Sequence, residues 1–242
     1  MDDGPWFRER LKTTPPNMKH LGFNFFCLIV YCVFNSSCTH SGGEATLDRE
    51  ELKGMVLPLE AYGPDVQTFE LSSDSGLKDN DTHLTEHTNP VDEARDITSF
   101  GRRIGYLMKF DAPVLRARVP EPGRISVASS VVVYGSENQA RQALADEFDD
   151  LSGEWTALRS GNRAVISGDE LSGREHRALL VAPNATMNGG LVITVQGFRS
   201  ESAIGMIFIM RNDGHSDEEE AERLADILMR RVQAYQQGTH SQ

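Results

Sequence analysis

Residues 190–210, GLVITVQGFRSESAIGMIFIM, contain two apolar runs separated by a short polar segment. Apolar runs rich in β-branched and aromatic residues and bounded by glycine or polar clusters are typical of strands. We therefore predict a hairpin whose strands cover 190–198 and 202–210 and are joined by a tight polar turn. Two earlier segments, 103–110 (RIGYLMKF) and 124–134 (RISVASSVVVY), have the same character and predict two further strands.

Helices are predicted between and after these strands. Ser136 and Gln139 have the spacing of a capping box, which predicts a helix over about 137–151. Ser216 and Glu219 have the same spacing and predict a closing helix to about residue 236. The remaining expectations are a short helix over 46–55, a helix over 91–99, a turn at 153–155, and strands over 162–167 and 176–182.

The predicted order is ββα, then ββββ, then a final helix. Closely spaced strands favour antiparallel pairing, and helices outside the strand runs favour segregation from the sheet. We therefore predict an α+β fold, an antiparallel β-sheet with helices packed on one face, which follows an N-terminal signal or anchor segment.

Composition limits the possible functions. The chain has 242 residues and a net charge of −12, with 39% hydrophobic and 25% charged residues. These proportions are ordinary for a globular domain. A strongly acidic chain is poorly suited to the many phosphate contacts of a general nucleic-acid binder, so no nucleic-acid partner is expected.

The N-terminus has the three parts of a secretory signal. Residues 1–19 are slightly basic, residues 21–34 (LGFNFFCLIVYCVF) are almost entirely apolar, and Asn35-Ser36-Ser37 is small and polar. A membrane-spanning helix needs about 20 apolar residues, so this shorter run favours cleavage over a permanent span. We predict a signal peptide over 1–37, with either Met1 or Met18 as the start.

Cys38 directly follows this segment and resembles the lipobox cysteine of bacterial lipoproteins. Ser36 and Ser37 fit that motif, whereas Asn35 stands where the family prefers leucine. The resemblance implies cleavage before Cys38, attachment of diacylglycerol to its thiol, and a location at the cell membrane or outer envelope. The other two cysteines, Cys27 and Cys32, lie inside the signal, so residues 39–242 contain none.

The rest of the chain is predicted to be one domain on a tether. Residues 38–45 are the lipidated cysteine and a small, polar, flexible tether. Residues 46–242 are a single α+β domain with a polar loop at about 72–90.

A possible metal motif lies in that loop. His83-Leu84-Thr85-Glu86-His87 resembles the H-x-x-E-H motif of inverted zinc metallopeptidases. The resemblance implies zinc ligation by His83 and His87 and a general base at Glu86. The surrounding residues are mostly polar, which favours solvated histidines in a loop, and neither a metal nor a cofactor is expected.

A basic segment interrupts the acidic chain. Residues 101–124 contain six basic and two acidic side chains, although the chain as a whole is acidic. Such a segment could contact an anionic ligand or an acidic protein, or its charges could protect strand edges. The candidate contact residues are four arginines: Arg102, Arg103, Arg116 and Arg118.

These patterns predict a non-enzymatic, membrane-tethered envelope lipoprotein that binds a ligand or partner of unknown identity. Its expected partners are the membrane, through the lipid anchor, and a protein or an anionic ligand. Two alternatives stay open: a secreted metal-dependent hydrolase that uses the motif at 83–87, and a structural or assembly protein of the envelope.

Overall fold

The structure is a computed structural model that describes residues 48–80, 99–113, 121–168, 175–183, 185–186 and 189–239. Residues 1–47, with the predicted signal and Cys38, lie outside this part of the chain. The described elements are α2 (Arg49–Met55), β1 (Glu70–Leu71), β2 (Gly76–Lys78), β3 (Arg102–Asp111), β4 (Arg124–Tyr134), α5 (Glu137–Leu158), β5 (Arg163–Gly168), β6 (Glu175–Pro183), β7 (Gly190–Ser200), β8 (Ala203–Arg211) and α6 (Glu218–Thr239). Two short 3-10 helices, Leu59–Tyr62 and Pro64–Val66, follow α2.

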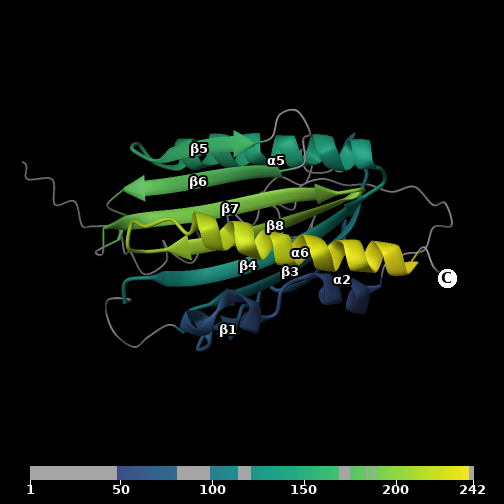
Figure 1. The fold of residues 1–242 in the computed structure, drawn as a ribbon. Helices are drawn as coiled ribbons and strands as arrows, with labels where there is room; N and C mark the ends of the chain where they lie inside the picture. The colour runs from purple at the N-terminus through teal and green to yellow at the C-terminus, as the bar shows by residue number, and fades with distance from the viewer. Residues whose placement is uncertain are drawn as a thin grey trace, which may run out of the picture.

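The strands form one antiparallel sheet of eight strands in the order β1-β3-β4-β8-β7-β6-β5, with β2 also paired to β3. The predicted hairpin is present as β7 and β8, and Ser200 pairs with Ala203 across the turn. Helix α5 carries the chain from β4 in the middle of the sheet to β5 at its edge, and β5 to β8 then return strand by strand (Figure 1). The predicted α+β class and the antiparallel sheet are confirmed.

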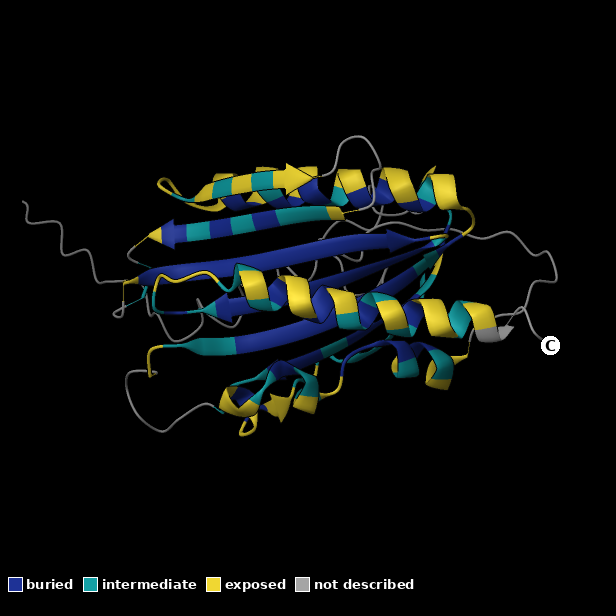
Figure 2. Ribbon diagram, viewed as in Figure 1, coloured by how far each residue is buried: buried dark blue, intermediate teal, exposed yellow. Residues whose placement is uncertain are grey.

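The helices cover both faces of the sheet, not the one face that we expected. Helix α5 packs on one face and helices α2 and α6 pack on the other, each over its own apolar cluster (Figures 1 and 2). Alternate residues of β8 divide between the clusters: Phe208 faces α5, whereas Ile207 and Ile209 face α6. All eleven positions of β7 are buried, as a strand covered on both faces requires.

Helix α5 begins where the capping box predicted and continues past the expected end. The backbone nitrogen of Gln139 donates to Ser136 Oγ, which caps the helix. The turn expected at 153–155 is absent, because the helix continues through Gly153 to Leu158. Trp155 is buried within it, and its Nε1 donates to Val181 O at 3.2 Å. The packing of this large side chain explains why the helix tolerates a glycine, which costs about 1 kcal/mol there.

The other two helices begin later than predicted. Helix α2 starts after Asp48, which forms a complete capping box with Glu51, whereas the predicted helix began at residue 46. Helix α6 starts at Glu218, two residues after the expected cap at Ser216.

The predicted polar loop contains a strand. Residues 76–78 pair with β3 as β2, and Ser75 exchanges two hydrogen bonds with the backbone of Lys109. The buried Lys109 ammonium contacts the carboxylates of Asp74, at 3.0 Å, and Asp111, at 3.3 Å. This contact ties the segment to the sheet. The rest of the loop, and nearly all of the helix predicted over 91–99, lie outside the described residues.

Candidate functional site

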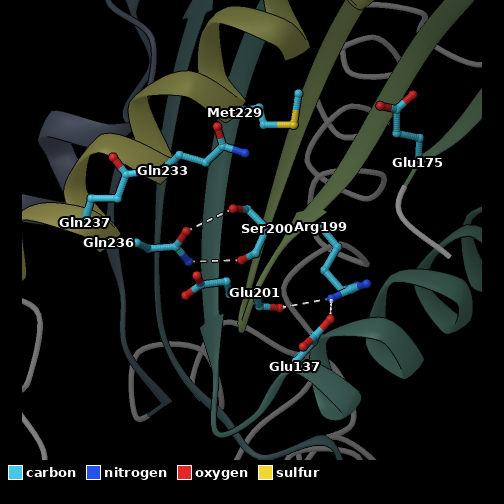
Figure 3. Close-up of a pocket in the computed structure, with 9 residues that line it drawn as sticks. All are labelled: Glu137, Glu175, Arg199, Ser200, Glu201, Met229, Gln233, Gln236 and Gln237. Atoms are coloured by element: carbon cyan, nitrogen blue, oxygen red, sulfur yellow. Dashed lines mark hydrogen bonds and ion pairs between the residues drawn. The ribbon is translucent and has the colours of Figure 1, made fainter. Parts of the chain in front are cut away.

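A polar pocket of about 580 Å³ lies at the end of the sheet where β7 turns into β8 (Figure 3). Four parts of the chain meet there: the first turn of α5, the first residue of β6, the β7–β8 turn and the second half of α6. The lining residues are Glu137, Glu175, Arg199, Ser200, Glu201, Met229, Gln233, Gln236 and Gln237. Three carboxylates and one guanidinium therefore share one pocket.

Arg199 is the buried charge of this pocket. Alternate residues of β7, including Val195, pack on the α5 side of the sheet, and Arg199 continues that series. Its side chain is only 6% exposed. Its Nη1 donates to Glu137 Oε1 at 2.5 Å and to the backbone oxygen of Glu201 at 3.5 Å.

Two nitrogens of Arg199 donate to no described residue. These are the covered Nε and the terminal Nη2, neither of which forms a hydrogen bond within the part of the chain that the structure describes. Figure 3 shows the second terminal nitrogen pointing away from Glu137. A guanidinium carries five N–H donors, so part of the capacity of Arg199 is available to an acceptor.

The opposite wall of the pocket comes from α6. Met229, Gln233 and Gln236 lie on one helical face because they are spaced by three and four residues. Gln236 is fixed to the end of β7: it accepts from Ser200 Oγ at 2.9 Å and donates to Ser200 O at 3.0 Å. These two bonds hold α6 against the strand and fix the width of the pocket.

The other two carboxylates of the pocket form no ion pair with a residue that the structure describes. They belong to Glu175 and Glu201, which are both exposed. Glu137 is 67% exposed on its side chain and is the acid that, among the described residues, forms an ion pair with Arg199. The pocket therefore offers N–H donors at its buried wall and carboxylate acceptors at its rim.

The predicted arginine surface is only partly described. Arg102 is 1% exposed, and its guanidinium donates to Lys78 O at 3.0 Å and to Asn80 Oδ1 at 3.4 Å. Burial lowers the pKa of Arg102 to about 10. Arg103 is exposed, so these two adjacent strand residues do not present one surface. Arg116 and Arg118 lie outside the described residues.

The remaining predicted site residues are likewise outside the described part of the chain. These are the lipidation candidate Cys38 and the motif residues His83, Glu86 and His87. Among the residues that are described, no three or more His, Cys, Asp or Glu side chains are placed to hold a metal ion.

An acid with a perturbed pKa lies on the α5 side. Burial raises the pKa of Glu147 well above its ordinary value, and the neighbouring carboxylates of Asp150 and Asp146 raise it further. Arg102 opposes this shift. Burial also raises the pKa of Tyr134, which is close to the same charges. This group is separate from the polar pocket, because none of its members lines it.

A charged network occupies the start of α6, at the other end of the sheet from the pocket. Asp217 accepts from Arg124 Nε at 2.8 Å and from Arg211 Nη1 at 3.2 Å, and Arg211 also contacts Asp213. Partial burial raises the pKa of Asp217, but these hydrogen bonds outweigh burial and hold the pKa below its ordinary value. Each charge here has a partner, so the network holds the helix end and leaves no free group for a ligand.

Sequence reasoning missed the pocket. One signal was present: Arg199 interrupts an apolar strand at a position that alternates with buried residues, and arginine is rarely buried without a partner. Its neighbours in the pocket come from four separate segments, which a single sequence does not bring together.

Comparison with known proteins identifies no family. No family model matches the chain, and no curated protein matches it. Among solved structures, the chain is similar to the extracellular domain of PknH from Mycobacterium tuberculosis, with 12% sequence identity and a TM-score of 0.49. The match covers 79% of this chain and 100% of that domain.

No helix in the described residues is both long enough and apolar enough to cross a membrane.

Proposed function

We propose that this chain is an exported, lipid-anchored envelope protein whose α+β domain binds a small ligand in the pocket around Arg199. In this proposal Cys38 carries the lipid, residues 38–45 are the tether, and the domain does not catalyse a reaction. The pocket replaces the arginine segment at 101–124 as the preferred ligand site, because Arg102 is buried and bonded to Lys78 and Asn80.

The unused donors of Arg199 are the observation that carries the binding proposal. Removing a charged group from water is costly unless its hydrogen bonds are replaced. Here Glu137 replaces part of them, whereas Nη2 makes no hydrogen bond in the described structure. A ligand with a hydrogen-bond acceptor in the pocket would bind the N–H donors of Arg199 that Glu137 does not use.

The anchoring part rests on the sequence. The basic start, the short apolar run and Cys38 occur in the order that export and lipidation require. The absence of cysteine from 39–242 leaves no other thiol for lipidation once the signal is removed. A net charge of −12 disfavours direct adsorption to an anionic membrane, so a polar tether would hold the domain away from the surface.

Thermal unfolding of the full chain with a panel of small polar metabolites tests the binding proposal. A ligand that binds only the folded state raises the Tm. We expect at least one compound to raise the Tm of the wild type, and the rise to be lost in Arg199→Gln and Glu175→Gln.

Glu60→Gln is the matched control, because Glu60 is exposed and lies outside the pocket. It should keep the full response. If every stabilising compound acts equally on wild type and on the pocket variants, or if no compound acts at all, the pocket is not a binding site.

A second candidate function, envelope assembly, is favoured by one observation. Val165 is 59% exposed on β5, which pairs only with β6 within the described chain, and the strand contains one charged residue, Arg163 at its start, and no proline to protect the sheet edge. A second copy of the chain could pair there. Analytical ultracentrifugation should then show concentration-dependent association that Val165→Lys abolishes, whereas Leu71→Lys on the opposite edge leaves it intact.

A further inference from the structure

We infer that the pocket around Arg199 recognises a basic amino acid, a small ligand with one carboxylate and two ammonium groups, for which lysine is the probe. This inference rests on the proposed function, because it takes the pocket to be a binding site. It adds the chemical class of the ligand, which three features of the pocket determine.

The first feature is the unused side of the Arg199 guanidinium. Nη1 is occupied by Glu137, whereas Nη2 makes no hydrogen bond to a described residue and points away from that glutamate (Figure 3). Charge-assisted hydrogen bonds from a guanidinium to a carboxylate are about twice as strong as neutral ones. A ligand carboxylate at Nη2 would therefore bind without displacing Glu137.

The second feature is a pair of acids, Glu175 and Glu201, that form no ion pair with a described residue. They come from separate elements, the start of β6 and the β7–β8 turn, and Figure 3 draws Arg199 between them. With Glu137 neutralising Arg199, these two carboxylates give the pocket a net charge of about −2. Two ligand ammonium groups, one near each acid, would compensate these two carboxylates, and the whole ligand, with its net charge of +1, would leave the pocket at about −1.

The third feature is the α6 wall. Met229 is an apolar surface among polar groups, and the stem of a long basic side chain packs well on such a surface while its charged end reaches water or an acid. The amide of Gln233 can accept from an ammonium group or donate to a carboxylate. The methylene groups between the two ammonium groups of the ligand would therefore pack against Met229.

Other ligand classes fit less well. A dianion such as inorganic phosphate would meet three carboxylates and one guanidinium that is already paired. A neutral polyol would leave the charge of Glu175 and Glu201 uncompensated. A diamine without a carboxylate would leave Nη2 of Arg199 unused.

Isothermal titration calorimetry of the full chain with lysine and two analogues measures how much the side-chain ammonium and the carboxylate of the ligand each contribute to binding. Norleucine lacks the side-chain ammonium, and 1,5-diaminopentane lacks the carboxylate. We expect lysine to bind at least about tenfold more tightly than either analogue, the size of one charge-assisted hydrogen bond. Inorganic phosphate and a neutral disaccharide should give no pocket-dependent heat.

Single substitutions in the pocket test which residue binds each charged group of lysine. Arg199→Gln should remove the advantage of lysine over 1,5-diaminopentane, and 1,5-diaminopentane should bind at least as tightly as to the wild type, because the variant also leaves Glu137 without its cation. Glu175→Gln and Glu201→Gln should each weaken lysine binding about tenfold. Both glutamates are exposed, so these two variants should fold even if the buried Arg199 variant does not. Glu60→Gln should bind lysine as the wild type does.

The outcomes separate this inference from the proposed function. If lysine does not bind, or binds equally to wild type and to the two glutamate variants, the ligand class assigned here is wrong. If another compound then raises the Tm in a way that depends on Arg199, the pocket remains a binding site. If no compound does so, both proposals fail.

Discussion

Phe198 and Gly205 pair directly across the β7–β8 hairpin. A Cβ added to Gly205 would overlap the Phe198 ring. The glycine thus leaves room for an aromatic side chain that belongs to the α6-side core. The side chain at position 205 therefore determines how closely the Phe198 ring can pack on the hairpin.

Gly205→Ala should therefore lower the free energy of unfolding by about 1–3 kcal/mol, the usual cost of overpacking a core. Urea denaturation of the variant and the wild type measures this difference. An unchanged midpoint would show that Phe198 moves aside without cost and does not pack on Gly205.

The bonds of Asp217 predict a pH-dependent stability. Asp217→Asn should destabilise the fold by about 2 kcal/mol near pH 7, because Arg124 and Arg211 lose a charged acceptor. The folded-state pKa of Asp217 lies below its unfolded value, so its contribution is complete above about pH 4 and declines as the pH falls through the folded pKa.

Unfolding of wild type and Asp217→Asn at a series of pH values checks this sign. The difference between them should be constant from pH 7 to about pH 5 and shrink below about pH 4. A difference that grows toward acid pH would contradict the assignment of the network.

The length of helix α5 determines which of its side chains pack into the core on one face of the sheet. A Cβ at Gly153 would meet no atom within 4 Å, and Gly153 does not have the positive φ that favours glycine. The last turns of the helix bring Trp155 into the core, and burial of this large apolar side chain stabilises the helical conformation there.

Gly153→Ala should accordingly stabilise the protein by about 0.5–1 kcal/mol, since alanine is the better helix former. It is also the counterpart of Gly205→Ala: the same substitution is expected to have the opposite sign in the same urea experiment. Destabilisation by Gly153→Ala would support the turn that the sequence suggested at this position.

Strand and helix positions were predictable where the signal is local. The strands at 103–110, 124–134, 190–198 and 202–210 and the cap at Ser136 lie within two residues of the prediction, because side-chain pattern and capping chemistry act over a few residues. The error at Gly153 arose where a distant contact, the packing of Trp155, overrides local propensity.

The faces of the sheet and the pocket depend on the whole molecule. Contacts between elements far apart in the chain determine which face of the sheet a helix covers. The unbroken apolar runs of β7 and β8 are nevertheless typical of strands that are buried on both faces. Counting charge along 101–124 suggested one arginine surface, whereas the alternation of a strand places Arg102 inside and Arg103 outside. The pocket needs four elements at once, so no local pattern predicts it.

At the scale of the whole molecule, the central proposal is a domain tethered by lipid to the envelope. It requires the chain to be cleaved before Cys38 and to carry diacylglycerol on that thiol, since one sequence feature supplies both the export signal and the anchor. The folded domain itself contributes no cysteine to this process.

Intact-mass analysis and N-terminal peptide mapping of the protein from the membrane fraction, for wild type and Cys38→Ala, test this proposal most directly. We predict a wild-type chain that begins at Cys38 and carries the added mass of diacylglycerol, and a variant that lacks this mass and leaves the membrane fraction. An unlipidated N-terminus, or a wild-type chain that still begins at Met1 or Met18, would contradict the lipid-anchored account.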